Sequence, residues 1–277
     1  MIRRPSVAML VLLIITSLSC SQLKKGWNNI NLFTPEQDIE LGKQVSDEIN
    51  GNPKDYPVLD RSKNLKIYQY VEKIRDEILA TGKIQYKDQF AWELRIIDND
   101  STLNAFVTPG GYIYVYTGIL SFLDTQDELA GVLGHEIAHA DQRHSTKQLT
   151  KVLGVAILAD AVLGERDALE QVVTALFQLS FSRANETEAD SYSVEYLCNT
   201  PYYAAGAAGF FKKMEGQPSP PEFLSTHPNP SNRVKNLEAQ RTEKACSGEE
   251  HYRAQYTAFK ELLKKKVSPF KPDDPVK

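Results

Sequence analysis

Two histidines lie four residues apart in this chain, at His135 and His139, and Glu136 directly follows the first. On a helix, residues four apart lie on one face, so both imidazoles can bind the same metal ion. A catalytic zinc site keeps one position open for water, and a neighbouring glutamate can accept a proton from that water. The H-E-x-x-H pattern therefore predicts metal-assisted hydrolysis. The alternative is an ordinary helix whose histidines pack or face water.

The residues around this pattern predict the helix that such a site requires. Thr125 followed by Glu128 is typical of a capping box, helical spacing then runs from Leu129 to Ala140, and no proline occurs before Leu149. Gly131 and Gly134 inside this helix each cost about 1 kcal/mol relative to alanine. They either admit the backbone of a neighbouring segment or reflect simple tight packing.

A second stretch of helix formers, from residue 181 to 197, offers acidic ligands. Glu186 and Asp190 share one helix face, and Glu188 points elsewhere. We predict that Glu186 is the third zinc ligand, which leaves the fourth position open. Asp190 would orient a ligand histidine through the other ring N–H of that histidine. In the alternative interpretation, all three acids form a solvated helix face.

The remaining histidines differ in their predicted relation to this site. His144 lies nine residues after His135, which places it on the opposite face of a continuous helix, so we predict that it is not a ligand. His251 is expected on the surface of a C-terminal helix. His227 is flanked by a proline in a loop, which is compatible with a surface residue.

The order of these motifs resembles a known family, the gluzincin zinc metallopeptidases related to the CAAX prenyl proteases. The soluble bacterial periplasmic branch, which is BepA/LoiP-like, is the most similar. The resemblance covers about Thr34 to Leu237. It is carried by residues 135–139 and 186–190, by 34–42 and 104–115, and by the H-P-x-x-x-x-R element at 227–233. It implies a zincin-like endopeptidase with one Zn²⁺ per chain.

The resemblance also implies roles for two residues of the H-P-x-x-x-x-R element. His227 would lie near the active site, either hydrogen-bonding a tetrahedral intermediate or occupying the open zinc position in a resting form. Arg233 would donate to the developing oxyanion or anchor the loop by binding a carboxylate. Both are therefore candidate catalytic residues beside Glu136.

The middle of the chain predicts a small sheet. Leu94 and Ile96 alternate with polar positions, and extended runs at 106–107 and 112–116 flank Pro109-Gly110-Gly111. These glycines supply the positive φ values of a tight turn. The fold class expected is α+β, mainly α, with a small sheet or hairpin beside the H-E-x-x-H helix.

In zincins a strand of this kind borders the cleft, where a substrate segment can pair with its edge through main-chain hydrogen bonds. An ordinary hairpin packed on the metal helix is the alternative. The predicted edge residues are Asn104, Ala105 and Phe106.

The first residues of the chain predict export. Arg3 and Arg4 precede a short apolar run, which indicates a signal peptide over residues 1–19. Cys20 directly after it predicts lipidation, with residues 20–31 as a tether; ordinary secretion is the alternative. We expect a metallopeptidase domain at 32–266 and a disordered tail at 267–277. The predicted location is the periplasm, with a lipid anchor in the outer membrane.

The net charge of the chain bears on which classes of partner it can bind, and its cysteines bear on whether a disulfide can form. A formal net charge of −4 argues against nucleic acid, because phosphate binding needs basic patches. Cys198 and Cys246 either form a disulfide, which the periplasm permits, or remain free thiols. The predicted partners are protein or peptide substrates and, through the anchor, the membrane.

These features together predict a zinc endopeptidase that cleaves misfolded or misassembled envelope proteins, with Glu136 as general base. The alternative is a non-catalytic periplasmic chaperone or assembly factor with a structural zinc. The intact Glu136 favours the enzyme, since a structural zinc site does not require a base.

Overall fold

A computed structural model of the chain describes residues 31–214, 222–228 and 232–269, and divides the chain into two units, Met1–Leu32 and Phe33–Lys277. The predicted signal sequence, Cys20, and most of the predicted tether and tail lie outside the described residues. In the second unit the helices are α2 (Pro35–Gly51), α3 (Leu65–Leu79), α4 (Thr117–Phe122), α5 (Gln126–Asp141), α6 (His144–Leu153), α7 (Val155–Val162), α8 (Arg166–Phe177), α9 (Arg183–Leu197), α10 (Ala207–Met214), α11 (Glu222–Thr226), α12 (Arg233–Glu243) and α13 (Arg253–Leu263). The strands are β1 (Leu94–Ile97), β2 (Ala105–Thr108) and β3 (Tyr112–Tyr116), with a 3-10 turn, η1 (Pro109–Gly111), between the last two.

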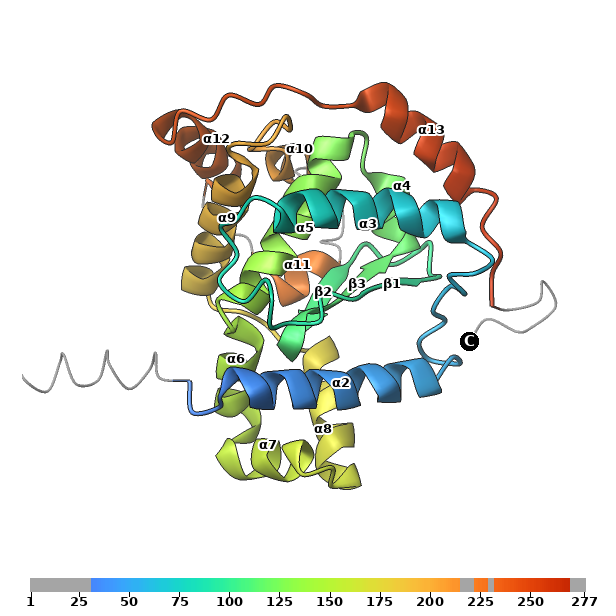
Figure 1. The fold of residues 1–277 in the computed structure, drawn as a ribbon, viewed down its shortest axis with the longest axis vertical. Helices are drawn as coiled ribbons and strands as arrows, with labels where there is room; N and C mark the ends of the chain where they lie inside the picture. The colour runs from blue at the N-terminus through green and yellow to red at the C-terminus, as the bar shows by residue number, and fades with distance from the viewer. Residues whose placement is uncertain (1–30, 215–221, 229–231, 270–277) are drawn as a thin grey trace, which may run out of the picture. The chain divides into compact units, whose positions relative to one another are not determined.

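The strands form one sheet in the order β1-β3-β2 within the described part of the chain. Strand β3 runs parallel to β1 and antiparallel to β2, with Ala105 opposite Val115. Gly110 and Gly111 have φ values of 73° and 86°, as the predicted turn requires. The expected class, mainly helical with a small sheet beside the H-E-x-x-H helix, is confirmed (Figure 1).

Helix α5 carries the H-E-x-x-H pattern and is buried along nearly its whole length. It packs against α3, α9, α10 and β2. Thr125 is its N-cap, as predicted, but the predicted capping box is wrong. The carboxylate of Glu128 instead accepts a hydrogen bond from the backbone N–H of Asp124, 2.7 Å away.

Two glycines bring neighbouring helices close to α5. A Cβ atom on Gly131 would lie 2.3 Å from the backbone nitrogen of Ala207, so Gly131 admits another backbone, one of the two predicted alternatives. A Cβ on Gly134 would lie 2.8 Å from the hydroxyl of Ser193 on α9. That hydroxyl also donates to the carbonyl of Gly131, 2.9 Å away. The glycines thus set the approach of α9 and the start of α10 to the metal-site helix.

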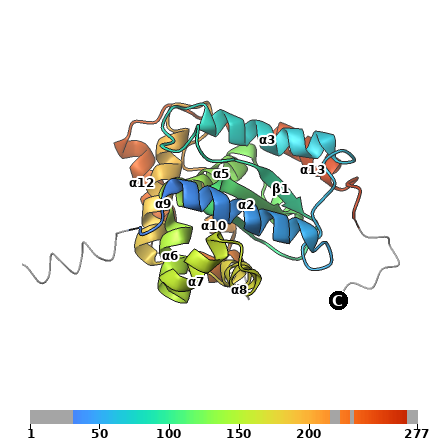
Figure 2. The same ribbon diagram turned by 60° about the horizontal axis from the view of Figure 1, so that its bottom comes forward.

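The chain turns sharply after α5, and the prediction of one continuous helix through His144 is wrong. Helix α5 ends at Asp141, Arg143 adopts the left-handed conformation (φ 56°, ψ 37°), and α6 begins at His144. Left-handed backbone costs a non-glycine residue about 1–2 kcal/mol. Asp38 of α2 offsets this cost, because it binds the Arg143 guanidinium at 2.5 Å and accepts from Thr146 at 2.7 Å. Figures 1 and 2 show the N-terminal end of α2 crossing next to α6.

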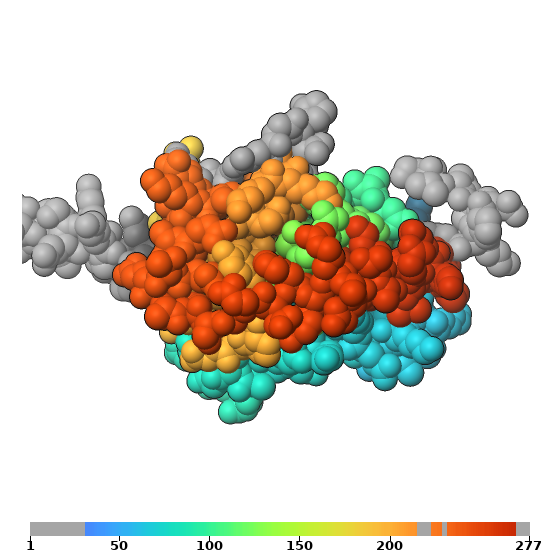
Figure 3. Space-filling model, turned by 90° about the horizontal axis from the view of Figure 1, so that it is seen from above, coloured from blue at the N-terminus to red at the C-terminus, as the bar shows by residue number. Residues whose placement is uncertain are grey.

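The last helix, α13, covers the face formed by α3 and α4. Figure 3 shows the red segment that ends in α13 lying across this face. Phe259 of α13 stacks on Tyr70 of α3 with ring centroids 4.2 Å apart, and the Tyr256 hydroxyl donates to the carbonyl of Leu120. After α13, the Val267 N–H donates to the side chain of Asn64.

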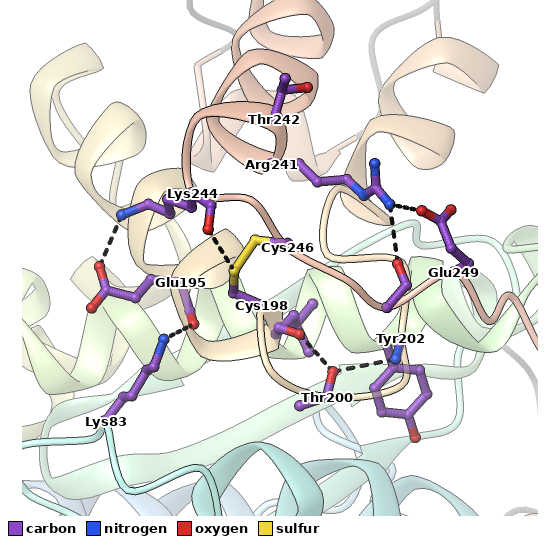
Figure 4. The surroundings of a disulfide bond; sticks show 12 residues. Lys83, Glu195, Cys198, Thr200, Tyr202, Arg241, Thr242, Lys244, Cys246 and Glu249 are labelled. Carbon is purple, nitrogen blue, oxygen red and sulfur yellow. Dashed lines mark hydrogen bonds and ion pairs between the residues drawn. A yellow bond between two sulfur atoms is a disulfide. The ribbon is translucent and has the colours of Figure 1, made fainter.

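A disulfide joins Cys198, at the end of α9, to Cys246, after α12 (Figure 4). It is the first of the two alternatives that the sequence left open. The two cysteines are separated by 48 positions in the sequence. The bond therefore links the helix that carries Glu186 to the segment that follows the helix carrying Arg233.

Removing this disulfide should lower the free energy of unfolding by about 2–4 kcal/mol, because the open chain regains loop entropy in the unfolded state. The measurement is urea unfolding of the wild type and of a Cys198→Ser/Cys246→Ser variant, each with and without reductant. Reductant should shift only the wild-type curve. Coincident wild-type curves in the two buffers would contradict the prediction.

Candidate metal centre

Four buried side chains gather at one point: His135, His139, Glu186 and His227. Each offers one nitrogen or oxygen, and these atoms all lie within 4.8 Å of one another. Helix α5 supplies the first two, α9 supplies Glu186, and His227 follows α11. The structure thus brings together the three predicted ligands and the predicted loop histidine.

The spacing of these atoms fits a tetrahedral zinc site. Zinc bonds to nitrogen or oxygen of about 2.05 Å place neighbouring tetrahedral ligands about 3.3 Å apart. The Nε2 atoms of His135 and His139 are 3.0 Å apart, and each lies 3.4 Å from an oxygen of Glu186. The Nδ1 atom of His227 lies 3.3 Å from His135 Nε2 and 3.2 Å from Glu186 Oε1. His227 therefore stands where the fourth ligand would be.

Glu136 is fully buried beside this cluster, and neither of its carboxylate oxygens has a hydrogen-bond partner among the described residues. The His227 ring approaches to 3.6 Å. Burial raises the pKa of Glu136 to about 7, and the nearby Glu186 carboxylate acts in the same direction. A buried carboxylate with free lone pairs can accept a proton from a water in the site.

Asp190 and Arg233 lie behind His135. Asp190 Oδ1 is 3.0 Å from His135 Nδ1, so an Nδ1–H would be bound there and Nε2 left facing the cluster. Arg233 donates to both oxygens of Asp190 at 2.7 Å. Burial alone would raise the pKa of Asp190, but the Arg233 charge, together with the hydrogen bonds from His135 and Arg233, outweighs burial and lowers the pKa. This geometry favours the predicted alternative in which Arg233 anchors its segment on a carboxylate.

Glu186 also has cationic surroundings. Arg233 lies 3.2 Å from its Oε2, and His227 lies 3.2 Å from its Oε1. Burial opposes ionisation, yet the His227 charge and the hydrogen bonds from the histidines hold the pKa of Glu186 well below its ordinary value. A permanently ionised carboxylate is the form that a zinc ion binds.

His144 reaches the surroundings of the site, although the sequence placed it on the opposite helix face. The turn at Arg143 redirects it, and its Nδ1 lies 3.1 Å from His139 Nδ1. Glu188, which was also expected to point elsewhere, lies 3.2 Å from His144 Nε2. No glycine or proline marks the turn in the sequence. The partner of the Arg143 side chain, Asp38, lies about a hundred residues earlier in the chain.

Comparison with known families identifies the chain. The model of peptidase family M48 matches residues 66–241, which is more than half of the sequence. The chain belongs to peptidase family M48. The metallopeptidase family predicted from the motifs is thereby confirmed.

Several curated relatives are similar over this region. Metalloendopeptidase OMA1, mitochondrial, of Danio rerio is 34% identical over 236 residues, which cover 77% of this chain and 48% of that protein. The mitochondrial metalloendopeptidase OMA1 of Schizosaccharomyces pombe is 33% identical over 61% of this chain and 51% of its own length. The beta-barrel assembly-enhancing protease of Yersinia pestis is 27% identical over 60% and 37%. The chain thus spans about half or less of these relatives.

Family M48 and the four-residue cluster together support the Zn²⁺ cofactor that the sequence predicts. Among the described residues, no helix has the length and apolar character needed to cross a membrane.

Strand β2 lies at the edge of the sheet, next to His227. A small cavity separates β2 from the segment after α8 and is lined by Asn104, Phe106, Leu179, Phe181 and His227. Internal contacts occupy main-chain groups of this strand: the Asn104 side chain accepts from the Ala105 N–H, and Ser145 donates to the Val107 carbonyl. Of the predicted edge residues, Asn104 and Phe106 therefore share a cavity with His227, and the main-chain N–H of Ala105 is bound by an internal contact.

Proposed function

We propose that this member of family M48 is a zinc-dependent endopeptidase that cleaves misfolded or misassembled proteins of the bacterial cell envelope. His135, His139 and Glu186 hold one Zn²⁺ ion, and Glu136 is the general base. The observation that carries this proposal is the tetrahedral spacing of the ligand atoms beside a buried carboxylate without a hydrogen-bond partner.

When bound, zinc supplies Lewis acidity, which acidifies a water and stabilises negative charge on a peptide carbonyl oxygen. Glu136 takes the proton of the attacking water and returns it to the leaving amine. Asp190, anchored by Arg233, keeps His135 in the tautomer whose Nε2 faces the metal. A substrate segment pairs with β2 at Asn104–Phe106 and displaces the contacts that cover this edge.

The location of His227 Nδ1 supports a resting form in which this side chain fills the fourth position. Hydrolysis requires that position for water and substrate, so the His227 side chain must leave it during activation. In the alternative role, the imidazole would donate to the tetrahedral intermediate.

His227→Ala should bind one zinc per chain, because three ligands remain, and should raise the rate of peptide cleavage. A tenfold increase would correspond to the loss of about 1.4 kcal/mol of resting-state stabilisation. Cleavage of a quenched fluorescent peptide, with zinc content measured on the same samples, tests this. A lower rate at unchanged zinc content would instead assign His227 to the intermediate.

The test of the overall proposal is casein cleavage by the full chain and by His227→Ala, with a chelator and after zinc is added back. Chelator-sensitive cleavage that zinc restores is the expected result. Casein binding without cleavage by either protein, at one zinc per chain, would favour the non-catalytic scaffold.

The envelope location is supported by the signal-like pattern before Cys20 and by the name of the Yersinia pestis relative. The OMA1 relatives are mitochondrial by name, so the N-terminal pattern carries this part of the proposal. In a bacterial host, the wild type should incorporate labelled fatty acid and fractionate with the outer membrane. Cys20→Ser should lose the label, and a labelled Cys20→Ser protein would contradict lipidation at this residue.

A further inference from the structure

A chain of hydrogen-bonding side chains extends from His139 away from the metal cluster. His139 Nδ1 lies 3.1 Å from His144 Nδ1, and His144 Nε2 lies 3.2 Å from Glu188 Oε2. The His139 and His144 side chains are fully buried, whereas the Glu188 side chain is 49% exposed. The contacts therefore run from the cluster to the protein surface along a path separate from Asp190 and Arg233.

The atoms in this chain leave one consistent assignment of protons. His139 directs Nε2 toward His135 and Glu186, and when this nitrogen binds the metal, Nδ1 carries the hydrogen. That Nδ1–H donates to His144 Nδ1, which must then be the acceptor. His144 consequently carries its hydrogen on Nε2 and donates it to the Glu188 carboxylate. In this assignment each ring nitrogen of the two histidines is a donor, an acceptor or a metal ligand, and both imidazoles are neutral.

Three elements hold His144 in this place. Helix α6 carries it, α9 carries Glu188, and α2 supplies Asp38, which binds Arg143 and Thr146 on either side of His144. Without the left-handed turn at Arg143, a continuous helix would direct His144 away from His139. The protein thus maintains an uncommon backbone conformation immediately before this side chain.

We infer that His144 and Glu188 are positioning residues that fix the tautomer and ring orientation of His139, as Asp190 does for His135. This inference rests on the proposed role of His139 as a zinc ligand. Outer hydrogen-bond partners of ligand histidines typically change metal affinity about 10- to 100-fold when they are removed. The effect of Glu188 is expected near the lower figure, because water can replace a half-exposed carboxylate.

The test measures zinc affinity of the full chain by competition with a chromophoric chelator, together with the visible spectrum of the Co²⁺-substituted protein. His144→Phe keeps a ring but removes both nitrogens, and should weaken zinc binding about 10- to 100-fold. His144→Asn can still accept from His139 and should recover much of the affinity. Glu188→Ala should weaken binding about tenfold. The matched control is Glu195→Ala, which removes another partly exposed acid of α9 and should bind as the wild type does.

Wild-type affinity and an unchanged cobalt spectrum in both His144→Phe and Glu188→Ala would overturn the inference. Equal losses in His144→Phe and His144→Asn would also overturn it, because they would indicate lost packing. If His144→Phe does not fold, the difference between Glu188→Ala and Glu195→Ala decides. A folded His139→Ala with undiminished zinc affinity would instead refute the ligand set itself. Zinc affinity and the cobalt spectrum do not depend on catalysis. They can therefore be interpreted even if the enzyme proves inactive.

Discussion

Glu136→Gln should lower kcat/KM for peptide hydrolysis by about 10²- to 10⁴-fold while zinc remains bound at one ion per chain. The amide has almost the same shape but cannot accept a proton from water. Glu136 has no hydrogen-bond partner among the described residues, so the substitution breaks no contact that the fold uses. This variant should therefore lose activity while its zinc content stays unchanged.

Protonation of Glu136 should also make kcat/KM fall on the acid side of its pH profile, which is called the acid limb below. Burial raises the pKa of Glu136 to about 7, and a bound cation would lower it, so the limb lies at or below that pH. The reactive form is the carboxylate, and kcat/KM should thus fall as pH decreases through this pKa. Measurements of kcat/KM from pH 5 to 8 on zinc-loaded enzyme test this.

A Glu136→Gln enzyme with wild-type activity would show that another group takes the proton.

Glu186→Ala should abolish stoichiometric zinc binding, giving the second large effect. The change removes the only anionic member of the ligand cluster. It also leaves Arg233 and His227 without the carboxylate that lies 3.2 Å from each of them. Breaking a buried ion pair in this way costs about 3–5 kcal/mol. The variant should therefore lose both zinc and stability, as measured by metal analysis and urea unfolding.

Glu186→Gln separates these two consequences. It keeps the side-chain volume but removes the charge, so zinc should still be lost while part of the stability returns. Glu195→Ala on the same helix serves as the control for a removed acidic residue. One tightly bound zinc in folded Glu186→Ala would place the third ligand elsewhere.

Local patterns predicted the helices and the turn that position the candidate site residues. The four-residue spacing of His135 and His139 needs only a helix, and Glu186 lies on a second helix with its own local signals. The glycines at 110 and 111 likewise determine a turn through their own φ values. These features depend on neighbouring residues, so they can be predicted from the sequence alone.

Features that depend on distant residues could not be predicted in this way. The turn at Arg143 has no local helix-breaking signal, and the carboxylate that binds this residue comes from α2. His144 was misplaced for that reason. The sequence could not decide between a disulfide and two free thiols, since the pairing of cysteines depends on the tertiary fold. The place of His227 was available only through the family resemblance.

The metal centre draws on chain segments that are synthesised at very different times. Helix α5 is complete long before His227 and Arg233 emerge, and Asp38 precedes both. No N-terminal fragment ending before residue 227 contains the whole cluster. The four-residue cluster is thus complete only after translation has passed most of the sequence.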